Sequence, residues 1–431
     1  MAVSRWTCAA AVALVLQLCG TSTFAAERTV VVTLFDGFAP AMADSTKTPN
    51  LDRIKKEGAW SRHLVPAFPT LSMTNHTTFA TGCWPEHHGI LSNIFYDPKR
   101  GRFGETMNVA DADWRTGCES MWEAAERQNV RAAVFNWVGR WSATRGKRAT
   151  YANPIVAWKD APSDDWVLQQ GLKMLADSGP AHPRLIALYF HGPDDLAHWH
   201  GTLSPEALAA VRKADAAVGK LMAAIGKLPK WREGTLIVGT DHGMMDVGPL
   251  VNVGRLMNAY DIHARQATDG ATAFLYLDKG ESADRVAGAL AAHKSEFDVY
   301  KKGHFPAFAH LGSGPRAPDL LLLTHPPYWI VGPEVMPRWA EMLGVNHMWP
   351  AAFTPFAGGL KATHGYDPHI VQMHGIFYAW GAGVAHGRQI PRLDMIDIHP
   401  TVMALLGLKP GQPVDGKTVA ALFAPGEDQR P

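Results

Sequence analysis

Short apolar segments alternate with amphipathic ones from residue 28 to residue 245, and this alternation restricts the fold more than any other feature. Thr29 to Phe35 is a continuous apolar run rich in β-branched residues, which is typical of a buried strand. Arg184 to Phe190 and Thr235 to Gly239 repeat this pattern, and Ser204-Pro205 begins a long segment with apolar residues at helical spacing. The alternation predicts an α/β fold in which helices cover both faces of a mostly parallel sheet.

The alternation stops after Met245. Between residues 246 and 360 we expect one strand, Thr272 to Leu277, and one helix, Ala283 to His293, followed by Pro, Gly and aromatic residues in irregular order. The earlier pattern resumes at Met373 and closes with a helix that ends at Gly407. We therefore predict a core of residues 27–245 and 361–431, with residues 246–360 as an inserted subdomain or cap.

Composition limits the classes of function. The chain has 431 residues, 47% apolar and 19% charged, which fits one large core or a core with a subdomain. Because 41 basic side chains balance 40 acidic ones, we expect no surface for nucleic acid. The 20 histidines direct attention to proton transfer and metal binding.

Residues 1–26 have the pattern of a cleaved signal peptide. Arg5 precedes an apolar stretch from Cys8 to Leu18, and small residues lead to a cleavage site near Ala25 or Ala26. A membrane anchor is the alternative, but a bilayer core needs about 20 apolar residues. We predict an exported protein, periplasmic or extracellular, with no membrane span in the mature chain.

Cleavage would leave two of the four cysteines, Cys83 and Cys118. In an oxidising compartment a disulfide between them is a reasonable hypothesis, and two buried free thiols are the alternative.

Acidic and histidine side chains follow three predicted strands. They are Asp36, Asp194 with His198, and Asp241 with His242. The carboxyl ends of strands are where ligands bind in open α/β sheets, and the i, i+4 spacing puts two of these side chains on one side of a helical turn. Each residue alone has an ordinary explanation, as a helix N-cap or a solvated histidine. Together they are enough ligands for two zinc ions.

Ser72 is a candidate nucleophile. It precedes residues 73–80, which could begin a helix whose N-terminus favours an anion. A serine at such a position is also the ordinary N-cap.

Further motifs extend over about residues 29 to 415. They are Leu34-Phe35-Asp36-Gly37-Phe38, Thr48-Pro49-Asn50-Leu51-Asp52, Pro66 to Thr70 with Asn75-His76, Thr81-Gly82 with Trp84 to Ile90, Asn93 with Tyr96-Asp97-Pro98, Pro193-Asp194 with His198, Thr240 to Met244, and Thr363 to Asp367. In this order they resemble the nucleotide pyrophosphatase/phosphodiesterase family of the alkaline phosphatase superfamily.

The resemblance implies an alkaline-phosphatase-like fold and a site with two Zn2+ ions. One ion would be held by Asp36, Asp241, His242 and the Ser72 oxygen, and the other by Asp194, His198 and His364. The implied enzyme is a phosphodiesterase or nucleotide pyrophosphatase that acts on a small-molecule substrate through a phosphoserine on Ser72. Asn93 would donate its amide to a phosphoryl oxygen.

The resemblance also suggests substrate-binding residues. Met73 stands where relatives often have an aromatic residue, and Tyr189 matches the family's other stacking position. Trp137 and Arg140 lie where relatives line the pocket, with packing as the alternative for Trp137.

Two other functions compete with a phosphodiesterase. A phosphomonoesterase could use the same scaffold, although Val138 stands where a lysine could bind the extra charge of a monoester. A non-catalytic binding protein is less consistent with seven ligand positions that all carry ionisable or hydroxyl side chains.

Overall fold

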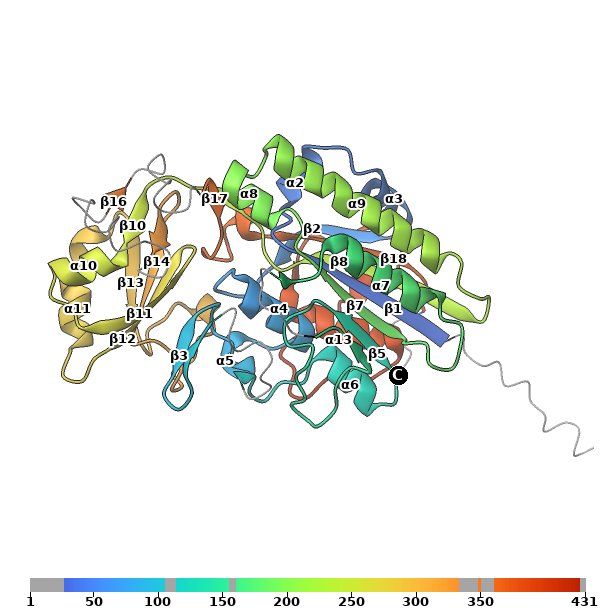
Figure 1. Ribbon diagram of the computed structural model, residues 1–431, viewed down its shortest axis with the longest axis horizontal. Helices are drawn as coiled ribbons and strands as arrows, with labels where there is room; N and C mark the ends of the chain where they lie inside the picture. Colours follow the sequence, from blue (N-terminus) through green and yellow to red (C-terminus); the bar gives the residue numbers. More distant parts are fainter. Residues whose placement is uncertain (1–26, 105–113, 155–159, 333–347, 350–359, 427–431) are drawn as a thin grey trace, which may run out of the picture.

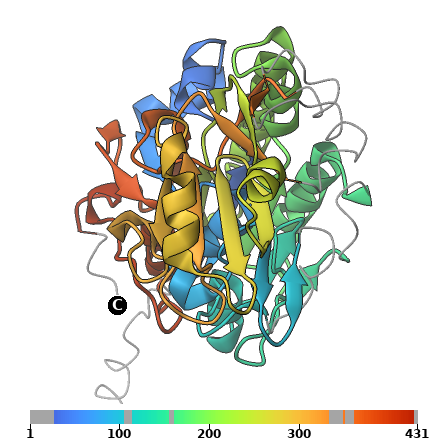
Figure 2. The same ribbon diagram turned by 90° about the vertical axis from the view of Figure 1, so that its left-hand side faces the viewer.

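A computed structural model describes residues 27–104, 114–154, 160–332, 348–349 and 360–426. The predicted signal peptide, residues 1–26, lies outside the described residues. Figure 1 shows a large part built on a long sheet beside a smaller part with its own sheet, and Figure 2 views the molecule from the side of the smaller part.

The central sheet has nine strands, and the predicted α/β fold class is confirmed. Its order is β19 (Arg388–Gln389), β2 (Ala59–Val65), β18 (Gly375–Gly381), β8 (Arg232–Thr240), β1 (Glu27–Phe35), β7 (Leu185–Phe190), β5 (Ala132–Phe135) and β6 (Tyr151–Ala152), with β20 (Leu393–Asp394) also on β2. Only β18 runs antiparallel to its neighbours, so the sheet is mixed but mostly parallel.

The three central strands end at one edge of the sheet. β1 pairs in parallel with β7 up to Phe35 and Phe190, and with β8 up to Phe35 and Thr240. The residues that follow these strands therefore lie close together, as the sequence predicts.

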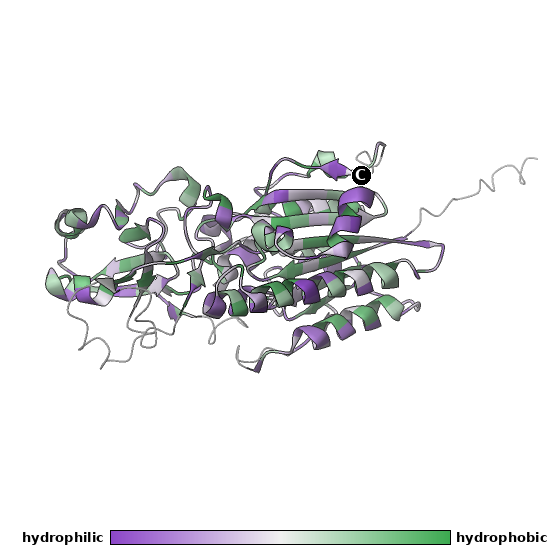
Figure 3. Ribbon diagram, turned by 90° about the horizontal axis from the view of Figure 1, so that it is seen from above, coloured by the Kyte–Doolittle hydropathy of each residue, from purple (hydrophilic) through white to green (hydrophobic). Residues whose placement is uncertain are grey.

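Helices cover both faces of this sheet. One face carries α2 (Pro40–Asp44), α3 (Pro49–Glu57), α7 (Asp164–Ala176), α8 (Asp194–His200) and α9 (Pro205–Ile225), and the other carries α4 (Ser72–Thr81), α6 (Met121–Arg127) and α13 (Ile398–Leu406). In β1, Val30 and Val32 pack into one of these layers and Val31 into the other, which explains the continuous apolar run. The outer helices show both hydrophobic and hydrophilic residues in Figure 3.

The smaller part contains more strands than the sequence predicted. A four-stranded antiparallel sheet has the order β11 (Ala264–Asp269), β12 (Thr272–Leu277), β14 (Leu320–Thr324) and β13 (Phe297–Lys301), and a three-stranded sheet has the order β15 (Trp329–Val331), β10 (Leu250–Asn252) and β16 (Met348–Trp349). The expectation of a single strand was wrong. β11 is largely polar and β10 and β15 have three residues each, while β14 is an apolar run that the irregular sequence around it concealed. The α-helices among its described residues are α10 (Val253–Ala259) and α11 (Ala283–Leu290). The predicted limits at residues 246 and 360 stay a prediction.

Two short pairs of strands and one helical turn lie outside these sheets. They are β3 (Phe95–Asp97) with β4 (Gly101–Phe103), β9 (Met245–Asp246) with β17 (Ala362–Thr363), and α5 (Pro85–His88). Cys83 and Cys118 form a disulfide, as hypothesised, and both are fully buried. Within the described residues, no helix has the length and apolar character needed to cross a bilayer.

Candidate metal centre

Ser72 lies at the start of a buried helix. It is the first residue of α4, all of whose residues are buried, and the preceding N-cap residue, Leu71, makes no side-chain capping hydrogen bond. The Ser72 side chain is therefore held beside the N-terminal N–H groups of α4, where negative charge is favoured. Its Oγ lies 3.2 Å from Nε2 of His242.

Three carboxylates converge on this serine from the ends of β1, β7 and β8. Asp36 follows β1, Asp241 follows β8, and Asp194 begins α8 after β7. Asp36 Oδ1, Asp194 Oδ1 and Asp241 Oδ2 are buried without a hydrogen-bond partner among the described residues. Burial and then the charges of Asp241 and Asp194 raise the pKa of Asp36 well above its usual value. A cation between carboxylates placed in this way would stabilise their charged form.

His242 directs its Nε2 atom toward the carboxylates, and this atom carries no proton. Its Nδ1 lies 2.9 Å from the carbonyl oxygen of Gly243, and because a carbonyl only accepts, Nδ1 carries the proton. Nε2 lies 3.3 Å from Asp36 Oδ1 and 3.4 Å from Asp241 Oδ2. This nitrogen and these two oxygens are all electron-pair donors, as a metal ion requires.

A second group consists of Asp194, His198 and His364, whose ligand atoms lie within 4.8 Å of one another. His198 Nε2 lies 3.2 Å from Asp194 Oδ2, and His364 Nε2 lies 3.8 Å from Asp194 Oδ1. The i, i+4 pair lies on α8, as the sequence predicts.

Backbone carbonyls orient both histidines of this group. His198 Nδ1 donates to the carbonyl of Ala362 at 2.7 Å, and His364 Nδ1 donates to that of Thr70 at 2.8 Å. Burial and the neighbouring His242 lower the pKa of His364 to about 3, so its Nε2 keeps a free electron pair. Hydrogen bonds of this kind to the distal nitrogen are the usual support of metal-binding histidines.

The structure thus brings together all seven side chains that the sequence analysis grouped as metal ligands. Two groups of Asp and His side chains could hold a metal at these positions, namely Asp194 with His198 and His364, and Asp36 with Asp194 and His242. The stacked rings of His242 and His364, with centroids 3.6 Å apart, place the two groups side by side. The chemistry of these donors fits divalent metal ions such as zinc.

His76 belongs to a third group that the sequence analysis left without a role. Its Nε2 lies 3.4 Å from Asp241 Oδ2, and the group also contains Asp36. Its ring packs between Tyr189 and Trp137, with centroid distances of 4.4 and 6.0 Å. His76 thus contacts Asp241 from the side of the hydrophobic core.

A cavity of about 300 Å3 opens beside these groups. Its lining includes Ser72, Asn93 and the ligand side chains Asp36, Asp194, His198 and His364. Asn93 Oδ1 accepts a hydrogen bond from the Met73 backbone N–H at 2.8 Å, which fixes the amide and directs its NH2 group away from α4.

The cavity also contains residues that the sequence analysis missed. Asp195, Trp199, Asp269 and Trp329 line it. Burial raises the pKa of Asp269, although a hydrogen bond with Asn93 opposes this shift. The Asp269-Gly270 pair between β11 and β12 is a recognisable hairpin signal, but nothing local indicates that this turn faces Ser72.

Tyr189 and Met73 do not line the cavity, which corrects the stacking roles expected of them. Tyr189 is fully buried, and its hydroxyl donates to Asp36 Oδ2. Met73 is buried in an apolar cluster with Phe68 and Phe274. Neither side chain can therefore stack on a substrate in this structure.

Trp137 and Arg140 are also packing residues and not substrate contacts. Trp137 is fully buried, and its Nε1 donates to the carbonyl of His76. The Arg140 guanidinium donates to the carbonyls of Trp137, Asn153 and Pro154. The Arg140 side chain therefore stabilises the loop to which it belongs.

Comparisons with known proteins identify the family. A family model described as type I phosphodiesterase / nucleotide pyrophosphatase matches residues 30–367. Human ectonucleotide pyrophosphatase/phosphodiesterase family member 7 is 28% identical over 394 residues, which cover 89% of this chain and 81% of the human protein. Venom phosphodiesterase 2 of Crotalus adamanteus is 25% identical over 398 residues, which cover 89% of this chain and 46% of the venom protein.

Solved structures show the same fold. An inactive form of murine ectonucleotide pyrophosphatase/phosphodiesterase 5, in complex with AMP, aligns with a TM-score of 0.79 and 24% identity over 92% of this chain and 100% of the murine chain. The human counterpart aligns with a TM-score of 0.76 and 23% identity, covering 90% and 97% of the two chains.

Proposed function

The chain belongs to the type I phosphodiesterase / nucleotide pyrophosphatase family, and we propose that it hydrolyses diesters through a covalent phosphoserine on Ser72 in a two-zinc site. Enzymes of this family cleave phosphodiester or pyrophosphate bonds, and that activity extends to this chain. One observation supports the two-zinc site and the phosphoserine on Ser72. Three buried carboxylate oxygens without hydrogen-bond partners lie near the Ser72 hydroxyl, which contacts His242. Zinc would be held by Asp36, Asp241, His242 and Ser72, and by Asp194, His198 and His364.

Bound zinc would lower the pKa of a coordinated hydroxyl and neutralise charge on phosphoryl oxygens. The chain itself supplies position and orientation. α4 places Ser72 Oγ at the cavity wall, so that it can bond to phosphorus as the bond to the leaving oxygen breaks. Water then cleaves the bond between phosphorus and Oγ and restores the hydroxyl.

Asn93 is proposed to bind a non-bridging phosphoryl oxygen through its side-chain NH2 group. The hydrogen bond from the Met73 N–H holds the amide in one orientation, which avoids reorganisation during the reaction. A fixed donor of this kind contributes about 3 kcal/mol to the stability of a transition state.

Diesters suit the cavity better than monoesters. Its described lining contains no Lys or Arg, while Asp195 and Asp269 add negative charge beyond the proposed ligands. Arg140, the cation that could have paired with a terminal phosphate, is bound to three carbonyls instead. The second negative charge of a monoester therefore has no basic partner among these residues.

The substrate is proposed to be nucleotide-like, since a murine relative binds AMP. The deciding experiment compares kcat/KM for a nitrophenyl nucleotide diester with that for nitrophenyl phosphate, using the zinc-loaded enzyme. We expect the diester to be favoured, and faster turnover of the monoester would show that the enzyme is a phosphomonoesterase.

We also propose that the protein is exported. The buried disulfide between Cys83 and Cys118 supports an oxidising compartment, periplasmic or extracellular. N-terminal sequencing of the protein made in its own cells should give a chain that begins near Glu27. A chain that retains Met1 would contradict export by cleavage.

A further inference from the structure

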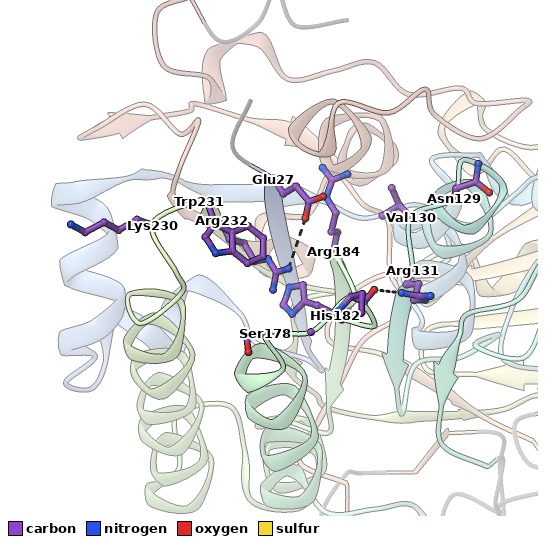
Figure 4. A pocket seen from close by; sticks show the side chains of 12 residues that line it. Glu27, Asn129, Val130, Arg131, Ser178, His182, Arg184, Lys230, Trp231 and Arg232 are labelled. Atoms are coloured by element: carbon purple, nitrogen blue, oxygen red, sulfur yellow. Dashed lines mark hydrogen bonds and ion pairs between the residues drawn. The ribbon is translucent and has the colours of Figure 1, made fainter. Parts of the chain in front are cut away.

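Figure 4 shows a second cavity. It lies at the amino ends of the central strands, whereas the candidate metal centre lies at their carboxyl ends. Its volume is about 730 Å3, and its lining comes from the amino ends of β1, β5, β7 and β8. β1 and β8 have nine residues each and run from this cavity to the metal centre, a length of about 30 Å. The cavity is therefore distinct from the site described above, and it is large enough for a ligand the size of a nucleotide.

Positive charge dominates the lining of this cavity. Four basic side chains contribute to it, namely Arg131, Arg184, Lys230 and Arg232. The single acidic side chain of the lining is Glu27, whose Oε2 lies 3.8 Å from Arg232 Nη2 and whose side chain is 55% exposed. One exposed carboxylate cannot neutralise this group, so the cavity attracts anions.

Arg232 is held rigidly and retains an unused donor. Its side chain is 4% exposed, and Nη1 donates to the carbonyl of Asp177 at 3.3 Å. Nε is buried and has no hydrogen-bond partner among the described residues. A buried guanidinium N–H without a partner costs free energy that an anion in the cavity would recover.

Arg184 is also fixed by backbone carbonyls. Its Nε donates to the carbonyl oxygen of Arg28 at 3.0 Å, and its Nη2 donates to the carbonyl oxygen of Leu406 at 3.1 Å. Burial lowers the pKa of Arg184, and the charge of Glu27 opposes this shift. The nearby positive charges of Arg232 and Arg28 lower the pKa further. Fixed cations that repel one another form a preorganised anion site.

An aromatic ring lies beside these cations. Trp231 is 52% exposed, and the Arg232 guanidinium carbon lies 4.2 Å from its ring centroid. An exposed indole next to guanidinium groups can stack on a planar ring whose phosphate the arginines bind.

We infer that this cavity is a second binding site, for a soluble phosphorylated ring compound of the nucleotide class. Arg184 and Arg232, with Arg131 and Lys230 at the rim, bind the phosphate, and Trp231 stacks on the ring. This goes beyond the proposed function, because no side chain of the metal centre takes part.

The test counts ligands per chain by isothermal titration calorimetry on the purified holoenzyme, in 0.15 M NaCl. The variant combines Arg131→Gln with Lys230→Gln, two exposed positions whose change should leave the fold intact. The control combines Lys220→Gln with Lys279→Gln, which removes the same charge from exposed positions elsewhere. AMP is the probe, with inorganic phosphate and adenosine as separate arms.

We expect the variant to bind one AMP fewer per chain than the wild type and the control, or to bind that AMP at least tenfold more weakly. Phosphate should show the same difference, and adenosine should not. Trp231→Ala should weaken AMP at this site several-fold and leave phosphate unaffected. Equal AMP stoichiometry and affinity in all three proteins would overturn the site, and phosphate binding without AMP binding would overturn the assignment of a ring-bearing ligand.

Discussion

Ser72 Oγ lies 3.2 Å from His242 Nε2, while the other ring nitrogen of His242 donates to the carbonyl of Gly243. Because the His242 proton is on Nδ1, the Ser72 hydroxyl donates to Nε2, and this nitrogen also lies 3.3 Å from Asp36 Oδ1 and 3.4 Å from Asp241 Oδ2. This relationship joins the proposed nucleophile to the proposed metal site.

Replacement of Ser72 should remove activity and leave the metal bound. Ser72→Ala deletes the oxygen that attacks phosphorus, but the carboxylates and histidines remain, so we expect turnover to fall to background with about two zinc ions still present. Diesterase assays together with elemental analysis check this. Ser72→Thr is the matched control, because it keeps the hydroxyl and should retain activity. An active Ser72→Ala enzyme would remove the covalent mechanism.

Replacement of His364 should release metal. Its Nε2 faces Asp194 and its Nδ1 is bound to the Thr70 carbonyl, so His364→Ala should lose about one zinc ion per chain. His325→Ala, which changes a partly exposed histidine paired with Asp298, should keep the full metal content. Unchanged metal in the His364 variant would contradict its assignment as a ligand.

Arg140 should affect stability and not substrate binding. Lysine carries its three donors on one nitrogen, so Arg140→Lys cannot reach three carbonyls that bond three separate nitrogens of the guanidinium. We expect a loss of about 2–3 kcal/mol with an unchanged KM for a diester. Arg148→Lys, an exposed change in the same loop, should alter neither quantity. Thermal unfolding and steady-state kinetics measure the two effects. A large rise in KM at constant stability would restore Arg140 to the substrate pocket.

The buried His399 should make stability fall in mild acid. Burial lowers its pKa to about 4, and its Nδ1 donates to the Ala80 carbonyl while its Nε2 accepts from the Gly411 N–H. An unfolded histidine has a pKa of about 6.5, so the unfolded state alone binds the proton between these values. Stability is complete above pH 6.5 and is lost as the pH falls toward 4.

The control for this effect is the variant His399→Gln, because glutamine does not titrate. Between pH 7.5 and pH 5 the wild type should lose about 2 kcal/mol more than the variant in unfolding experiments. Equal losses in the two proteins would show that His399 does not contribute to the acid sensitivity.

The sequence was sufficient to predict the centre of the fold and the meeting of three acidic side chains at one edge of the sheet. Parallel strands must end at a common edge, so Asp36, Asp194 and Asp241 could be expected to meet from the pattern alone. His364 could not be placed in this way, because it follows residues 246–360, whose sequence is irregular, and is far from the others in the chain. Its position depended on the resemblance to a family.

The sequence did not indicate which of these side chains would be buried and which would line the cavity. Tyr189 was expected to stack on a substrate, yet its ring lies in the layer between the sheet and α4, where its hydroxyl donates to Asp36. Asp269 lines the cavity although the sequence did not indicate it. Its hairpin turn is recognisable, but its contact with Asn93 depends on how the smaller part packs against the larger one. Both depend on contacts between distant segments.

The stereochemical course at phosphorus tests the central claim most directly. The wild-type, zinc-loaded enzyme would hydrolyse a diester of a chiral phosphorothioate in isotopically labelled water, and the configuration of the product would be determined. Attack by Ser72 followed by attack of water inverts phosphorus twice, so we predict overall retention of configuration. Inversion would show a single displacement by water and would contradict a covalent intermediate on Ser72.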